Sequence, residues 1–351
     1  MLARQAGPAF ALGAALLFGL STPAAKLLVG AIDPWLVAGL LYLASGLGLG
    51  LVRAGRSFIR PTTAETALAA HDLPWLGGAI LAGGIVGPVL LMFALAWGSA
   101  AQSALLLNLE GVFTVLLAWV VFREHVAARI GAGMAAITAG AIVLAWPGSG
   151  PTRLDGSAML VAGACLAWAI DNNLTHKVSG SDPVQIAAVK GVVAGAVNVL
   201  AAVARGAEWP PAGAVLGATV VGLLGYGASL ALFVLGLRHL GAARTGAYFG
   251  TASFVGALGG VLALREPVTP HLLVAGVLMA VGVWLSLTER HAHEHVHGPL
   301  EHEHLHWHDE HHQHDHSSGT PAEEPHAHRH AHRPLRHRHP HYPDLHHRHP
   351  H

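Results

Sequence analysis

Three charged residues, Glu110, Asp171 and Lys190, lie within long apolar stretches of the chain. A charge at the centre of a bilayer costs about 2.5–3.5 kcal/mol on insertion scales, so each of them should face a cavity, a partner or the interior of a helix bundle. Glu110 precedes Arg123 by 13 residues, which is about 20 Å along a helix and places it close to the bilayer midplane. A carboxyl group there can take up a proton or hold a cation.

Asp171 and Lys190 fall at similar depths in neighbouring apolar stretches, so we expect them to pair. Such a pair either locks two helices together or takes part in transport, and the sequence leaves both open. Amide side chains add donors and acceptors, although each amide alone is more simply explained by a hydrogen bond between helices. The predicted transport pathway comprises Glu110, Asp171, Lys190, Asn108, Asn172 and Asn198.

A second group of chemically active side chains follows Arg290, where 23 of the 28 histidines lie. Imidazole binds zinc, copper, nickel and cobalt, and flexible imidazoles do not select among them by geometry. With few aliphatic residues, the segment 291–351 cannot bury a core, and we expect a disordered tail that binds metal or is merely solvated. The candidate metal ligands are His291, His293, His295, His297, His302, His304, His306, His308, His311, His312, His314 and His316.

The rest of the chain must position these groups in a membrane. Apolar residues make up 52% of the sequence, charged residues 11%, and the mean hydropathy is +0.47 despite the polar tail. These values predict an all-α, multi-pass membrane protein surrounded by a lipid bilayer. The apolar stretches predict ten helices, at 8–29, 34–52, 73–96, 99–121, 127–146, 156–175, 183–204, 213–237, 242–264 and 270–288.

The ten helices divide into two copies of a five-helix unit. The stretch 97–125 reappears in degraded form at 240–267, and the glutamates that end the copies, Glu124 and Glu266, are 142 residues apart. Asp-Pro pairs at 33–34 and 182–183 repeat with an offset of 149. Because five is odd, the two copies must have opposite orientations, with a site at the interface of the halves. We expect Glu124 and Glu266 to be structural, interacting with helix ends or a nearby arginine.

Basic residues at the helix ends predict the orientation in the membrane. With the amino terminus inside, ten Lys and Arg residues fall on the inner side and four on the outer side. This excess favours two cytoplasmic termini in the cell (inner) membrane. Cys165 is the only cysteine, which excludes an intrachain disulfide or a cysteine metal site.

The repeats resemble the EamA domain of the drug/metabolite transporter superfamily. The resemblance covers 8–146 and 156–288, and it rests on the long apolar fourth helix that ends at Glu124 or Glu266 and on Gly-rich fifth helices, GAGMAAITAGAIVLAW and VAGVLMAVGVWLSL. Related domains often have a basic residue where Lys190 falls. They also often have a proline in the middle of the fourth helix, where this chain has Asn108 to Gly111. The resemblance implies an exporter of amino acids, other metabolites, drugs or metal ions.

These observations predict a secondary exporter. The sequence has no nucleotide-binding loop and no clustered catalytic motif outside the tail, so we expect neither an enzyme nor a required cofactor, and no nucleic-acid partner. The tail and Glu110 favour a divalent metal cation (nickel, cobalt or zinc) as cargo. The resemblance alone favours a small organic metabolite or amino acid, with the tail only buffering metal. A membrane-anchored metal sensor or store is a further alternative, and the sequence leaves a homodimer open.

Overall fold

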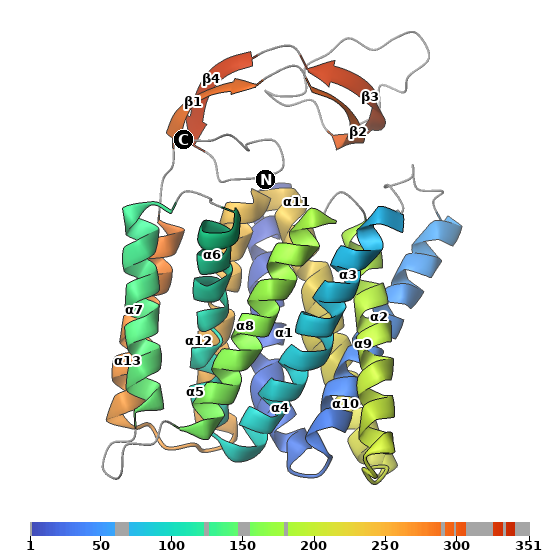
Figure 1. Ribbon diagram of the computed structural model, residues 1–351, viewed down its shortest axis with the longest axis vertical. Coiled ribbons are helices and arrows are strands. Elements are labelled where there is room, and N and C mark those ends of the chain that lie inside the picture. The colour runs from blue at the N-terminus through green and yellow to red at the C-terminus, as the bar shows by residue number, and fades with distance from the viewer. Residues whose placement is uncertain are drawn as a thin grey trace.

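The structure is a computed structural model of a helical bundle and part of the tail (Figure 1). The described residues are 2–59, 70–122, 126–146, 155–178, 182–288, 292–297, 300–306, 326–332 and 335–340. The first repeat contains α1 (Leu2–Val29), α2 (Pro34–Ile59), η1 (Ala70–Asp72), α3 (Leu73–Ala79), η2 (Ile80–Val86), α4 (Gly87–Trp97), α5 (Ala100–Leu106), α6 (Leu109–Phe122) and α7 (Ala128–Ala145). The second contains α8 (Gly156–Lys177), α9 (Pro183–Ala204), α10 (Ala212–Val221), η3 (Gly222–Ala228), α11 (Ser229–Phe249), α12 (Ala252–Ala263) and α13 (Pro270–Leu287).

Eight described segments are long and apolar enough to cross a membrane by length and composition, and α8 and α12 complete the ten. The α8 helix crosses the bundle beside them (Figure 1), but its last turns, from Asp171 to Lys177, are rich in polar residues. The α12 helix has only 12 residues because the end of α11 supplies the rest of the ninth span. The predicted all-α membrane fold is therefore confirmed for the bundle.

Two predicted helix boundaries were wrong. The fourth helix is not continuous, because it breaks at Leu107 and Asn108 between α5 and α6. The eighth helix does not end near residue 237, because α11 continues to Phe249 and the chain breaks at Gly250 and Thr251 instead. Alanines 242, 243 and 247 have the highest helix propensity, and they outweigh Gly241, at which we had expected a loop.

The repeat extends to the irregular parts of the backbone. The third span contains the π-helix η2 and the eighth contains the π-helix η3, which begin 142 residues apart at Ile80 and Gly222. The helices α7 and α13 have the same offset at both ends. The breaks at 107–108 and 250–251 also correspond, within one residue. Shared irregularities at one offset indicate a duplicated backbone.

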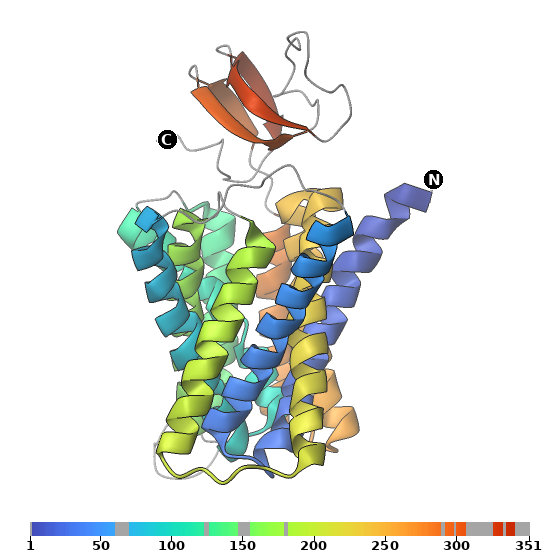
Figure 2. The ribbon, with the colours of Figure 1, turned by 90° about the vertical axis from the view of Figure 1, so that its right-hand side faces the viewer.

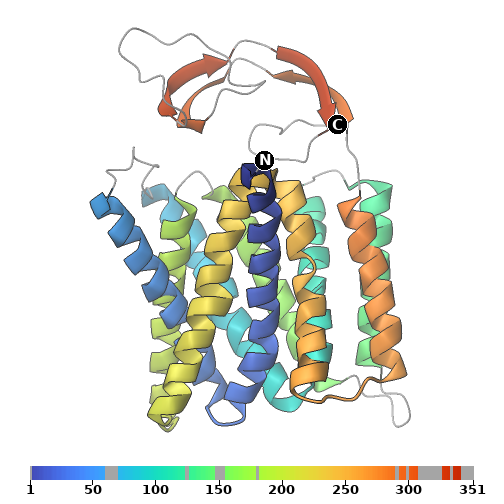
Figure 3. The same ribbon diagram turned by 180° about the vertical axis from the view of Figure 1, so that it is seen from behind.

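The two halves have opposite orientations, as predicted. The start of α1 and the end of α13 lie at one face of the bundle (Figure 3), and α8 runs from the other face towards it. The α12 to α13 connection lies at the opposite face from the end of α6 and the start of α7 (Figure 1). Helices of the two halves pack against each other: α2 with α9 and α7 with α13, which hold equivalent places in their repeats, and α1 with α11, which do not. Figure 2 shows α2 beside α9.

Close backbone contact explains the glycines at these pairings. A Cβ at Gly46 of α2 would lie 2.4 Å from the Val192 nitrogen of α9, and one at Gly133 of α7 would lie 2.7 Å from the Gly282 oxygen of α13. Small residues let membrane helices approach in this way, where lipid offers no hydrophobic drive for association.

Four segments of the tail are described as strands. The strands β1 (Ala292–His297) and β4 (Leu335–Pro340) pair antiparallel, as do β2 (Leu300–His306) and β3 (His326–His332). Histidine at every second position has the period of an extended strand, a pattern that we interpreted only as metal ligation.

Candidate functional site

The α8 helix carries side chains that contact two irregular backbone segments of the first repeat. Cys165 faces the break between α5 and α6. Trp168 and Asp171 face the π-helix η2, and Asn172 faces the start of α6. Irregular backbone at membrane depth needs such partners, because lipid offers no hydrogen bonds. This helix therefore organises the candidate site.

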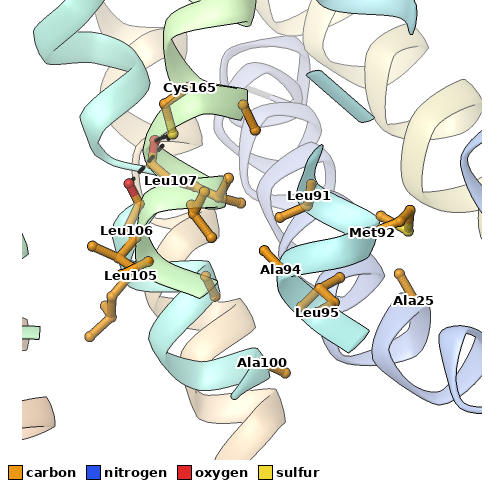
Figure 4. Packing of buried hydrophobic residues seen from close by; sticks show 14 of the residues in the cluster. Ala25, Leu91, Met92, Ala94, Leu95, Ala100, Leu105, Leu106, Leu107 and Cys165 are labelled. Atoms are coloured by element: carbon orange, nitrogen blue, oxygen red, sulfur yellow. Dashed lines mark hydrogen bonds between the residues drawn. The ribbon is translucent and has the colours of Figure 1, made fainter. Parts of the chain in front are cut away.

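The break between α5 and α6 places Glu110 in the first turn of a helix. The thiol of Cys165 contacts the carbonyl oxygens of Leu106 and Leu107 at 3.6 and 3.8 Å (Figure 4). Glu110 lies in the first turn of α6, and the start of a helix carries a partial positive charge that favours a carboxylate. We had expected Glu110 in the middle of a continuous helix, and the break changes its electrostatic setting.

Glu110 is held by an amide group of α8, which a hydroxyl group of α6 also contacts. The Asn172 amide donates to Glu110 Oε1 at 2.9 Å and contacts Thr114 Oγ1 at 3.4 Å. Among the described residues, Glu110 makes no ion pair, although Lys190 and Asp171 are close enough to interact with it electrostatically. A single carboxylate without a cationic partner can bind a cation or a proton.

Asn172 is exposed, and its position on α8 shows which side of the helix its side chain lies on. Ile170, 37% exposed, belongs to the apolar outer stripe of the helix. Two residues correspond to a rotation of about 200°, so Asn172 lies on nearly the opposite side of α8. Its amide is therefore accessible on the side that faces α6 and not on the apolar outer stripe.

Asp171 and Lys190 form the predicted pair. Lys190 Nζ donates to Asp171 Oδ1, and their side chains are 17% and 10% exposed, respectively. Thr175 Oγ1 donates to the same carboxylate at 2.8 Å and lies 3.1 Å from Lys190 Nζ. The three groups satisfy one another, so the pair locks α8 to α9 and leaves Glu110 as the net charge of the cluster.

Three side chains from different helices donate to the carbonyl groups of η2. Tyr42 Oη of α2 lies 3.1 Å and Trp168 Nε1 of α8 lies 2.9 Å from the Gly83 oxygen. The Asn198 amide of α9 lies 3.2 Å from the Gly84 oxygen. A Cβ at Gly83 would lie 2.0 Å from Asp171 Oδ2, so the paired carboxylate lies directly against this glycine.

The six predicted pathway residues therefore separate into two groups. Glu110, Asn172, Asp171 and Lys190 lie together. The Asn108 amide instead donates to the Leu105 oxygen at 2.9 Å, at the end of α5. Asn198, which is fully buried, holds η2. Sequence reasoning missed Tyr42, Trp168, Thr114 and Thr175, because no charge or repeat singled them out.

The glutamate that ends the second repeat is structural, as expected. Glu266 accepts hydrogen bonds from Ser99 Oγ and from the backbone N–H groups of Ala100 and Ala101, at 2.7, 2.7 and 2.8 Å. It thereby satisfies the free N–H groups at the start of α5, in the other repeat. Glu124 lies outside the described residues.

The described part of the chain has no group of three or more His, Cys, Asp or Glu residues that could hold a metal ion. Within the tail, only the backbone of the strands is described, so the side chains of His293, His295, His297, His302, His304 and His306 are not placed. The other candidate ligands, His291, His308, His311, His312, His314 and His316, lie outside the described residues. Metal binding by the tail stays a prediction.

Comparison with known proteins agrees with this architecture. The model of the EamA-like transporter family matches residues 5–146 and 156–288, one match for each repeat. A protein of Methanothermobacter thermautotrophicus described as an uncharacterized transporter is 27% identical over 285 residues, covering 78% of this chain and 83% of the relative. A solved crystal structure superimposes with a TM-score of 0.59 at 16% identity, covering 81% of this chain and 96% of that one, and so shares the fold. The chain belongs to the EamA-like transporter family and is a multi-pass membrane transporter, not an enzyme.

Proposed function

We propose that the protein is a secondary exporter of a positively charged solute, with Glu110 as the carboxylate that binds it. The observation that carries the proposal is the charge arrangement in the bundle. Asp171 and Lys190 neutralise each other, whereas Glu110 has the Asn172 amide as a partner and no ion pair among the described residues. In a low-dielectric site, such a charge attracts a cation, and a proton can replace the cation at release.

We favour a divalent metal cation, nickel, cobalt or zinc, because of the 23 histidines of the tail. The tail follows α13, which ends at the face of the bundle where α1 begins (Figure 3). If that face is cytoplasmic, as the basic residues predict, the tail gathers ions on the side from which they are exported. Because no three-ligand group exists in the described bundle, an ion bound at Glu110 keeps most of its water.

A small organic cation is the second candidate, and a chain of aromatic rings favours it. The Tyr42 and Tyr226 rings are 5.6 Å apart, Tyr226 and Phe18 5.9 Å, Phe18 and Phe249 5.4 Å, and Phe249 and Phe233 4.8 Å. The Tyr42 hydroxyl is close enough to Glu110 and Asp171 to interact with both electrostatically. Aromatic faces attract organic cations, so this arrangement suits an amine with an apolar body.

Export assays with Glu110→Gln test the proposal. We expect the variant to reach normal membrane levels and to lose transport, because the amide cannot neutralise a cation. Glu208→Gln is the matched control, since it makes the same chemical change at an exposed residue between α9 and α10. Retained transport in Glu110→Gln would remove this carboxylate from the mechanism.

The cargo is identified in a sensitive deletion strain challenged with a panel of metals, amino acids and organic amines. Restored nickel, cobalt or zinc tolerance with lower cell-associated metal supports the metal. Tolerance to amines alone supports the second candidate. Metal uptake into inside-out vesicles, with and without a pH gradient, then tests direction and proton coupling.

Deletion of residues 291–351 separates a carrier from a membrane-anchored metal sensor or store. A carrier retains transport with a changed apparent affinity, because Glu110 and its neighbours remain. Complete loss of function with normal membrane insertion would favour the sensor or store.

A further inference from the structure

The π-helix η2 is held by hydrogen bonds from Tyr42 and Trp168 that the transport proposal does not use. The Gly83 oxygen accepts hydrogen bonds from Tyr42 Oη at 3.1 Å and from Trp168 Nε1 at 2.9 Å, and so ties the third span to α2 and α8. Neighbouring helices commonly satisfy backbone groups that irregular membrane helices leave free. Here two donors from different helices converge on one carbonyl oxygen.

The same glycine supports the charged pair. Asp171 follows Trp168 by three residues on α8, so both side chains face η2. Trp168 holds the Gly83 oxygen while the Asp171 carboxylate fills the space that a Gly83 Cβ would occupy. Lys190 donates a hydrogen bond to Asp171, so the position of the lysine side chain depends on the same contact.

The second π-helix offers a natural contrast. In η3, Gly225 lies against Ser21, whose hydroxyl donates to the Phe18 oxygen of its own helix at 2.6 Å. Among the residues described by the structure, no side chain donates to a carbonyl group of η3. The arrangement at Gly83 is therefore specific to the half that contains the charges.

We propose that Tyr42 and Trp168 are positioning residues of the transporter: they hold the Gly83 carbonyl, keep η2 π-helical, and so fix the Asp171–Lys190 pair beside Glu110. The inference goes beyond the proposed cargo, because it concerns the backbone on which the pair rests. Tyr42→Phe and Trp168→Phe each remove one donor and leave an aromatic ring in place. The double variant leaves the carbonyl with neither side-chain partner.

Hydrogen–deuterium exchange of the purified full-length protein in lipid nanodiscs tests the positioning without any cargo. We expect the double variant to exchange about tenfold faster across residues 80–86, with 222–228 unchanged. Each single variant should change less than half as much on a logarithmic scale, because the other donor remains. Tyr226→Phe is the matched control and should leave 80–86 unchanged. Unchanged exchange at 80–86 in the double variant would overturn the proposal, whatever the cargo is.

A double-mutant cycle then separates positioning from general stability. The readout is uptake of the cation selected by the panel into inside-out vesicles. We expect Trp168→Phe alone to lower the maximum transport rate several-fold with little change in KM. In a Thr175→Val background, the same substitution should lower the rate much less, because the Asp171 carboxylate has already lost one donor. Equal losses in both backgrounds, with a lower melting temperature, would mean that Trp168 only stabilises the fold. If no probe is transported, the exchange result alone decides, so failure of the cargo proposal and failure of this one remain distinct.

Discussion

The two π-helices η2 and η3 have the same length and the same place in their repeats, yet their surroundings differ in charge. Gly83 of η2 lies against Asp171, whereas Gly225 of η3 lies against Ser21. With the repeat offsets, Leu41 corresponds to Lys190 and Ala252 to Glu110. Every charge of the candidate site is thus matched by an uncharged residue in the other half.

This difference teaches that the duplication preserved the backbone and not the chemistry. Two similar halves of opposite orientation provide a scaffold that can open to either side of the membrane. A second set of buried charges would add a further desolvation cost of several kcal/mol per ion without a second cargo to bind. Aromatic rings fill the equivalent space around η3, where Phe18 and Tyr226 pack edge to face. The predictions below test whether the two sites really differ in this way.

The largest effect is expected from breaking the charged pair. Lys190→Met leaves Asp171 buried without its cation and should lower the free energy of unfolding by about 3–5 kcal/mol. Combining it with Asp171→Asn removes both charges and should recover most of that loss, while transport stays low. Thermal unfolding in nanodiscs measures both variants. Leu41→Met, at the equivalent position, should cost less than about 1.5 kcal/mol, and an equal loss there would contradict the contrast.

Placing a charge in the uncharged half should be the next largest effect. Ser21→Asp puts a carboxylate against Gly225, while Lys26 of the same helix donates to the Leu95 and Gly98 oxygens instead. We therefore expect a loss of about 2.5–3.5 kcal/mol in the free energy of unfolding. Adding Leu41→Lys recreates the arrangement of the other half and should restore part of the stability. Melting temperatures of the two variants give the result. If the Ser21→Asp variant were as stable as the wild type, the region around η3 would have to be hydrated.

Glycine substitutions should give a smaller effect that distinguishes the two contacts. Gly83→Ala would bring its Cβ to 2.0 Å from Asp171 Oδ2 and should cost about 1–3 kcal/mol by overpacking. Gly225→Ala would meet Ser21 Cβ at 2.5 Å, so Ser21→Gly should relieve it without loss of transport. Gly77→Ala, with no atom within 4 Å, is the control and should be neutral or stabilising. Transport that survives Gly83→Ala unchanged would show that the Asp171 contact is dispensable.

The sequence predicted the fold well because hydrophobic length and internal repetition are local signals. The inverted halves and the Asp171–Lys190 pair follow from span counting and depth. The π-helices did not follow, because their residues, such as Gly83 and Gly225, also suit an ordinary packed membrane helix. The break at Asn108 was missed because we interpreted Asn108 and Gly111 as parts of one continuous membrane span.

The sequence predicted only the charged residues of the site, because charges are rare inside a membrane. Glu110 and Lys190 stood out because each is costly to bury. Trp168 did not, because an aromatic residue in an apolar helix suggests packing, and its N–H partner is the backbone of another helix. Hydrogen bonds to carbonyl groups leave no trace in the sequence, which explains why half of the site appeared only in three dimensions.

The smallest effect concerns the two Asp-Pro starts of α2 and α9. Asp33 accepts hydrogen bonds from the Trp35 and Leu36 N–H groups, whereas Asp182 caps α9 and also pairs with Arg53 of α2 at 2.9 Å. Partial burial raises the pKa of Asp182, but the hydrogen bond from Arg53 and the backbone donors outweigh it, so the pKa lies below its ordinary value. A lowered pKa stabilises the folded state above the unfolded value of about 3.9, and the contribution is lost as pH falls through the folded pKa.

Arg53→Met should therefore cost about 0.2–1 kcal/mol at pH 7, and progressively less as the pH falls below about 4. Melting temperatures of wild type and variant across this range measure the difference. Asp33→Asn is the control for the cap alone. It removes a cap carboxylate whose described contacts include backbone N–H groups and no arginine. A penalty for Arg53→Met that persists after Asp182 is protonated would show that the arginine stabilises α2 and α9 by packing. In that case, this contrast between the Asp-Pro starts would not depend on the ion pair.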